Sequence, residues 1–277
     1  MATAPGPLEA TINYAPASLD AEVKPEIQAR APRTAGEARR ARTGIDRHGF
    51  DIVDARSLDR PASLDTEGVE LHRLATAATD LYDDAQVRGI YFPEVIRLVA
   101  EVTGAARVEA FDYNLRNATR AERGDPGVQS PVKYAHNDYT VKSGPRRVRD
   151  LFPDEAETLL AKRVAVINVW KPISGPVIDT PLAVCDAASI GDGQLIATNL
   201  AYTERTGEIY SLGFSEGHRW LYYPQMRADE AMLLKCYDSE TDGRARFTAH
   251  SAFRDPGAPE DAPARESIEV RTLAFFD

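Results

Sequence analysis

The chain has 277 residues, 43% of them hydrophobic and 27% charged, a composition typical of a globular protein. Its 33 Lys and Arg against 43 Asp and Glu give a formal charge of −10, which disfavours partners such as nucleic acid or an anionic membrane. Two cysteines and five histidines exclude a disulfide framework, a thiolate zinc cluster and any large histidine-based metal site.

The N-terminal region is predicted to be an arm with two short strands. Residues 1–45 are rich in Ala, Pro and Arg, and the basic run at 33–44 is typical of a solvated surface segment. Strands are expected at 10–14 and 51–56, where apolar and polar residues alternate. No segment resembles a secretory signal or approaches the roughly 20 apolar residues of a membrane span, so we expect a cytoplasmic protein.

Helices are expected from residue 65 to residue 104. In the first part of this segment, apolar residues recur every two to four positions, at Val69, Leu71, Leu74, Ala77 and Leu81. A second helix follows, because Pro93 is suited to its start and Gly104 to the position just after its end.

The rest of the chain is predicted to be rich in strands. A strand at 106–116 is followed by a polar loop at 117–132, then by a charged segment after 142 that is helical in its second half. A strong strand at 163–173 and at least seven later strands predict a barrel or sandwich rather than βαβ units. We therefore expect one domain over 1–277, with an arm and helices at 1–104 and a jelly-roll-like core at 105–277.

His136 and Asp138 form the first chemical signal. Residues two apart in an extended chain point to one face, so this imidazole and this carboxylate can reach one ion. A histidine from another strand would complete the 2-His-1-carboxylate triad of non-haem Fe(II) oxygenases, which leaves coordination positions open. His-x-Asp/Glu occurs often by chance, so the pair needs support from its context.

Two histidines are candidates for the third ligand. His250 lies in the penultimate predicted strand, and in a double-stranded β-helix that strand meets the strand carrying the first pair. His218 is the alternative, although a hydrogen-bonded role lining a pocket suits it better. After His250 come Arg265, Ser267 and Arg271, whose groups could hold the distal carboxylate of a keto-acid co-substrate.

Several motifs together resemble one oxygenase family. They are His-Asn-Asp-Tyr-Thr (136–140), Ser-Gly-Pro-Arg-Arg-Val-Arg-Asp-Leu (143–151), Asn-Val-Trp-Lys-Pro-Ile (168–173), Pro-Leu-Ala-Val-Cys-Asp (181–186), His-Arg-Trp-Leu-Tyr-Tyr (218–223), Leu-Lys-Cys-Tyr-Asp-Ser (234–239) and Arg-Glu-Ser-Ile-Glu-Val-Arg (265–271). The family includes the cephem hydroxylase of the cephamycin pathway and fungal hydroxylase/desaturases. The resemblance covers about residues 10–276.

The resemblance implies a double-stranded β-helix that uses Fe(II), 2-oxoglutarate and O₂. It implies that His136, Asp138 and His250 bind the iron, and that the basic residue for the co-substrate is Arg265 or Arg271. Arg265 has the Arg-x-Ser context with Ser267 seen in related oxygenases. The implied reaction hydroxylates or desaturates a small natural product through a ferryl oxidant.

Other residues and functions remain open from the sequence. Asn168 is either a co-substrate ligand or a satisfied polar group of the core, while Cys185 and Cys236 lie in apolar strands as inert thiols. One alternative function is a cupin-like metal enzyme that uses no keto-acid. Another is a non-catalytic β-barrel binding protein. The sequence indicates neither the oligomeric state nor the identity of the substrate.

Overall fold

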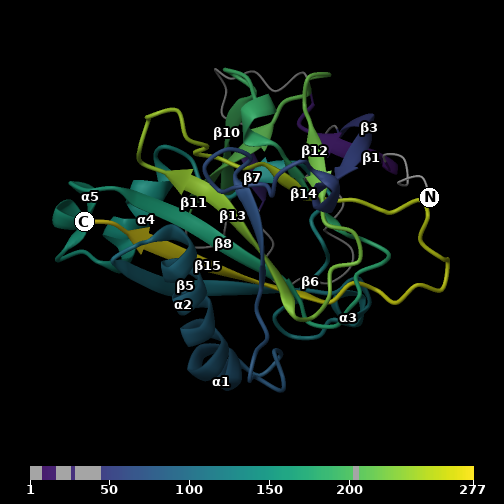
Figure 1. Ribbon diagram of the computed structural model, residues 1–277, viewed down its shortest axis with the longest axis horizontal. Coiled ribbons are helices and arrows are strands. Elements are labelled where there is room, and N and C mark those ends of the chain that lie inside the picture. Colours follow the sequence, from purple (N-terminus) through teal and green to yellow (C-terminus); the bar gives the residue numbers. More distant parts are fainter. Residues whose placement is uncertain (1–7, 17–25, 29–44, 202–205) are drawn as a thin grey trace.

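In the computed structural model the described residues are 8–16, 26–28, 45–201 and 206–277, and they form two β-sheets facing each other (Figure 1). The basic run at 33–44 lies outside these residues. The first sheet has nine strands in the order β1-β3-β12-β9-β14-β7-β11-β10-β2. Their bounds are β1 Leu8–Tyr14, β2 Glu26–Gln28, β3 Asp46–Asp54, β7 His136–Asn137, β9 Leu182–Cys185, β10 Leu195–Ala201, β11 Thr206–Leu212, β12 Trp220–Tyr222 and β14 His250–Ala252.

The second sheet has six strands in the order β4-β13-β8-β15-β5-β6. Their bounds are β4 Val69–Arg73, β5 Arg107–Arg116, β6 Val128–Gln129, β8 Val164–Pro172, β13 Glu230–Asp238 and β15 Ser267–Phe275. Every residue of β8 is buried, because the strand is central and both faces of this sheet are covered. The expected jelly-roll fold is confirmed, and residues from the N-terminal region contribute strands to both sheets.

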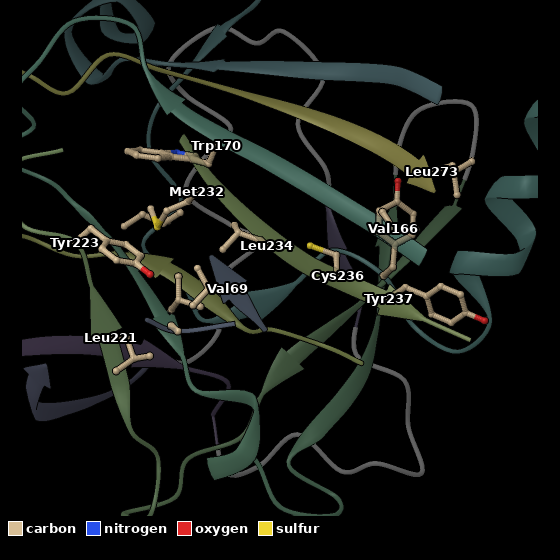
Figure 2. Close-up of a cluster of buried hydrophobic side chains, with 14 of the residues drawn as sticks. Val69, Val166, Trp170, Leu221, Tyr223, Met232, Leu234, Cys236, Tyr237 and Leu273 are labelled. Atoms are coloured by element: carbon tan, nitrogen blue, oxygen red, sulfur yellow. The ribbon is translucent and has the colours of Figure 1, made fainter. Parts of the chain in front are cut away.

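The main core lies between the two sheets. Figure 2 shows Val166 and Trp170 of β8 with Met232 and Leu234 of β13 on one side, and Leu221 of β12 reaching toward them from the other sheet. A second apolar cluster covers the outer face of the six-stranded sheet, where Ile167 and Val169 of β8 pack beneath the main helix. Side chains of β8 thus alternate between the interior and the outer layer.

That helix, α2 (Phe92–Thr103), follows the short α1 (Asp84–Gln86) and a π-helical turn, η2 (Val87–Tyr91). Its sequence signals are confirmed, since Pro93 lies in its first turn and Gly104 ends it with a left-handed φ of 70°. Within the described residues, no helix is both long and apolar enough to cross a membrane.

The prediction of a helix from residue 65 is wrong over Val69–Arg73. This segment forms β4 and pairs antiparallel with β13. The spacing of Val69 and Leu71 fits a strand as well as a helix, and the open edge of β13 supplies backbone hydrogen bonds that decide for the strand. The residues from 74 to 83 contain no helix, only loop and turns.

Two further segments differ from the expectation. The predicted loop at 117–132 contains the short helix α3 (Ala118–Arg123), capped by the Asn117 side chain, and the strand β6. The charged segment after 142 is helical in both halves, as α4 (Ser143–Leu151) and α5 (Ala156–Leu160), and not only in the second. Short 3₁₀ turns at Ala55–Ser57 (η1) and Ala187–Ser189 (η3) complete the elements.

Candidate metal centre

Strand pairing brings two histidines together. β7 and β14 are antiparallel neighbours, and His250 is the direct cross-strand partner of His136 although the two lie far apart in the sequence. Their ring centroids are 4.6 Å apart. Directly opposed residues in an antiparallel pair project to the same face of the sheet, so both imidazoles point to one place.

Asp138 completes the cluster from the end of β7. Its Oδ1 lies 3.4 Å from Nε2 of His136, and the ligand atoms of Asp138, His136 and His250 all lie within 4.8 Å of one another. Two imidazoles and one carboxylate match the donor set that Fe(II) has in the facial triad of non-haem oxygenases.

Backbone carbonyl groups fix the tautomer of each histidine. Nδ1 of His136 is 2.7 Å from the carbonyl oxygen of Tyr134, and Nδ1 of His250 is 3.1 Å from that of Thr248. A carbonyl only accepts, so each Nδ1 carries the hydrogen and each Nε2 keeps its lone pair for a metal. Burial and the nearby His136 lower the pKa of His250 to about 4, so this imidazole is neutral at pH 7.

The second oxygen of Asp138 is held by the six-stranded sheet. Asn168 Nδ2 of β8 and Arg271 Nε of β15 both donate to Oδ2 of Asp138, each at 2.9 Å. Burial by itself would raise the pKa of Asp138, but Arg271 and the two histidines hold it well below its usual range. Arg271 also lies 3.2 Å from Asp112 and 3.6 Å from Glu269, so three carboxylates surround its guanidinium.

Arg265 lies in a different environment. It is 5% exposed, donates through Nη1 to the carbonyl oxygen of Thr180 at 2.8 Å, and its guanidinium lies over the ring of Trp170, 5.3 Å from the ring centroid. Its Nε and the Oγ of the buried Ser267 have no hydrogen-bond partner among the described residues. Burial lowers the pKa of Arg265 to about 9. A guanidinium N–H and a hydroxyl that are both buried and both lack a partner, two positions apart in the sequence, suit an anionic ligand that accepts from both.

His218 is remote from the metal cluster in its contacts. Trp220 Nε1 donates to the Tyr14 hydroxyl (2.7 Å), which donates to His218 Nδ1 (3.1 Å), and His218 Nε2 donates to Gln194 Oε1 (2.8 Å). Both ring nitrogens of His218 therefore take part in hydrogen bonds. This arrangement fits a hydrogen-bonded histidine rather than a metal ligand. Cys185 and Cys236 are both buried thiols.

Glu269 is a site residue that the sequence reasoning missed. Its Oε1 accepts a hydrogen bond from Asn168 at 3.3 Å, and burial and the negative charge of Asp138 raise its pKa. A signal was present in the sequence: Ser267, Glu269 and Arg271 alternate along β15 and therefore share a face.

A jelly-roll of two sheets that carries two histidines and a carboxylate inside defines the class of non-haem iron oxygenases. Comparison with known proteins agrees. A family model described as an oxidoreductase/YMDC permease-like domain (YDMC) matches residues 12–275. The Fe(II)/2-oxoglutarate-dependent dioxygenase nvfI of Aspergillus novofumigatus is 39% identical over 70% of this chain and 69% of its own length.

The alpha-ketoglutarate-dependent dioxygenase phiK of a fungal species is 34% identical over 87% of this chain and 88% of its own. The solved structure of the iron and alpha-ketoglutarate-dependent endoperoxidase NvfI superposes with a TM-score of 0.84 at 30% identity and covers 98% of both chains. The chain belongs to this family of Fe(II)- and 2-oxoglutarate-dependent dioxygenases.

Proposed function

We propose that the enzyme oxidises a small natural product by hydroxylation or desaturation, with iron bound by His136, Asp138 and His250. The three ligand atoms within 4.8 Å of one another carry this proposal. The reaction type is supported by the hydroxylase/desaturase efuI of Hormonema carpetanum, 32% identical over 82% of this chain and 83% of its own. The substrate class is supported by the aspirochlorine biosynthesis protein N of Aspergillus oryzae, 41% identical over 48% of this chain and 56% of its own.

We propose that Arg265 and Ser267, rather than Arg271, bind the distal carboxylate of 2-oxoglutarate. Arg265 Nε and Ser267 Oγ are both buried and lack a partner among the described residues, so a carboxylate that accepts from both would satisfy both groups. Arg271 already faces Asp138, Asp112 and Glu269, and a further carboxylate there would meet repulsion. Asn168 then orients Asp138 instead of the co-substrate.

When bound, iron and 2-oxoglutarate activate O₂ and supply the oxidising equivalents. The chain's residues position and protect that chemistry. Hydrogen bonds from Arg271 and Asn168 to Oδ2 of Asp138 orient the carboxylate so that Oδ1 faces the two histidines. Trp170 lies against the Arg265 guanidinium and would shield a carboxylate bound there from water, which strengthens the charge pairing.

An anaerobic titration with Fe(II) and 2-oxoglutarate tests the site. Wild-type protein should develop the weak visible charge-transfer band of the chelate, and Asp138→Ala and His250→Ala should abolish it. His218→Ala is the matched control and should keep the band, because His218 is engaged with Tyr14 and Gln194. Absence of the band in wild type at saturating iron, or its loss in His218→Ala alone, would overturn the assignment.

We further propose that residues 1–277 act as a single oxygenase domain whose partner is a small molecule and neither nucleic acid nor membrane. Support comes from the two-sheet fold, to which β1, β3 and β4 contribute, and from the acidic charge of −10. A single cooperative unfolding transition would support one domain. The cytoplasmic location expected from the sequence remains a prediction that cell fractionation tests.

A further inference from the structure

Lys171 is a buried cation on the face of β8 that points away from the metal cluster. Because side chains alternate along a strand, Lys171 shares a face with Val169, which packs in the outer apolar cluster, while Asn168 and Trp170 face the interior. Lys171 is 1% exposed, and its Nζ has no hydrogen-bond partner among the described residues. A buried ammonium group in this condition calls for a compensating group.

The charged groups around Lys171 are engaged with other partners or are not hydrogen-bonded to it. Asp229 and Glu94 are the carboxylates that act on it. Asp229 is already paired with Arg73 at 2.8 Å and with Arg227 at 2.9 Å. Glu94 Oε1 accepts the backbone N–H of Ala77 at 2.9 Å and so holds the segment that covers the lysine. Glu94 Oε2 has no hydrogen-bond partner among the described residues, so neither carboxylate is hydrogen-bonded to the Lys171 ammonium, which keeps its donors for a ligand.

Lys171 also lines a cavity. The cavity has a volume of about 330 Å³, at the lower end of the range of small-molecule sites. Much of its wall is apolar, formed by Ala75, Ala78, Leu81 and Ile173. The polar wall includes Asp229, whose negative charge is paired with Arg73 and Arg227. It also includes Thr76, whose hydroxyl oxygen accepts from the Ala78 backbone N–H at 3.1 Å and whose own hydrogen can therefore be donated to a ligand.

The geometry points to a second ligand site, in which Lys171 binds a small monocarboxylate with a short aliphatic body. The carboxylate would accept hydrogen bonds from the Lys171 ammonium and the Thr76 hydroxyl, and the aliphatic part would contact the alanine and leucine side chains. This site is on the opposite face of the sheet from the metal cluster. It therefore does not depend on the function proposed above.

Butanoate is a suitable probe, with the neutral butanamide as its matched control. The protein is first loaded with Mn(II) and saturating 2-oxoglutarate, so that the carboxylate pocket at Arg265 is filled. Isothermal titration calorimetry should then detect one molecule of butanoate per chain and no binding of butanamide. Lys171→Met should weaken butanoate binding at least tenfold, while Lys162→Met, at a surface lysine near Asp277, should leave it unchanged.

Failure to bind butanoate at millimolar concentration would overturn the proposal, as would equal binding by wild type and Lys171→Met. If the Lys171 ammonium paired with Glu94 in solution, the protein would not bind butanoate. Thermal melting shows whether Lys171→Met is folded, and Lys171→Gln provides a second variant if the methionine is not tolerated. If the wild-type protein bound butanoate but no metal, the metal assignment would be wrong and the second site would stand.

Discussion

Arg265 and Arg271 lie close together in the sequence, yet their contacts assign them different tasks. Arg271→Met should weaken metal binding about 10- to 100-fold, because Asp138 then loses a donor that orients it. Arg265→Met should weaken 2-oxoglutarate binding by about 3 kcal/mol, on the order of 100-fold, and leave metal affinity unchanged. Competition with a chromophoric chelator measures the metal affinity, and calorimetry on the Mn(II) form measures the co-substrate. If Arg271→Met weakened 2-oxoglutarate binding and Arg265→Met did not, Arg271 would be the residue that binds the co-substrate.

For single residues, the sequence could predict which residue types form the site and how they are spaced, but not which side chains contact one another. The two-residue step from His136 to Asp138, the strand order and the family resemblance favoured His250 but kept His218 as the alternative. Arg265 and Arg271 could not be separated, because both are cations near the same strand. Only the contacts of each guanidinium distinguish them: Arg271 faces three carboxylates, whereas Arg265 faces none and has an Nε without a partner among the described residues.

His218 should make folding stability depend on pH. Burial lowers its pKa to about 4 from the ordinary 6.5, so between these values the unfolded chain binds the proton that the folded chain refuses. Stability contributed by neutral His218 is present above pH 6.5 and is lost as the pH falls toward 4, by about 2–3 kcal/mol.

Urea unfolding at a series of pH values tests this with His218→Gln, which should flatten the loss in this window. A His218→Gln curve parallel to that of wild type would show that this residue does not cause the dependence.

At the scale of elements, the turn before β4 supports the strand pairing at the metal site. Gly68 has a φ of 79°, and a Cβ there would lie 2.0 Å from the Oγ1 of Thr248. The Thr248 hydroxyl donates to the carbonyl oxygen of Gly68, and the Thr248 carbonyl accepts from His250. A displaced Thr248 therefore moves a proposed metal ligand.

Gly68→Ala should destabilise the protein by about 3 kcal/mol or more and weaken metal binding. Gly193→Ala is the matched control: its φ is also 79°, but nothing lies within 4 Å of the added Cβ, so only about 1 kcal/mol is expected. Free energies of unfolding and metal affinities measure both effects. Equal costs for the two variants would mean that Thr248 moves aside freely.

Some secondary-structure elements could be predicted from the sequence and others could not. α2 was recognisable because its start and end residues are local signals. β4 was not, because its identity depends on β13, which lies more than 150 residues later. Extended chain was expected around both histidines, but the sequence did not show that the paired strands are as short as β7 with two residues and β14 with three.

For the whole molecule, the metal cluster joins the two sheets. His136 and His250 belong to the nine-stranded sheet, while the groups that hold Asp138 come from β8 and β15 of the six-stranded sheet. Binding of a metal to the folded form alone at 100 times its Kd stabilises it by about 2.7 kcal/mol. Mn(II) should therefore raise the melting temperature by about 5–10 °C, and a chelator should reverse the rise.

2-Oxoglutarate should raise the melting temperature further, and Arg265→Met should remove this second increment while keeping the first. Asp138→Asn should reduce both, because an amide is a poorer metal ligand than a carboxylate. A full metal-dependent rise in Asp138→Asn would place the ion elsewhere.

The direct pairing of His136 with His250 has a consequence for folding kinetics. The two strands can meet only after a long stretch of chain has closed between them, and such contacts form late because their loop-closure entropy is large. A metal should therefore slow unfolding without accelerating folding. In stopped-flow experiments with Mn(II), we expect the unfolding arm of the chevron to fall and the folding arm to stay in place. Accelerated refolding would instead mean that the histidines meet before the barrel closes.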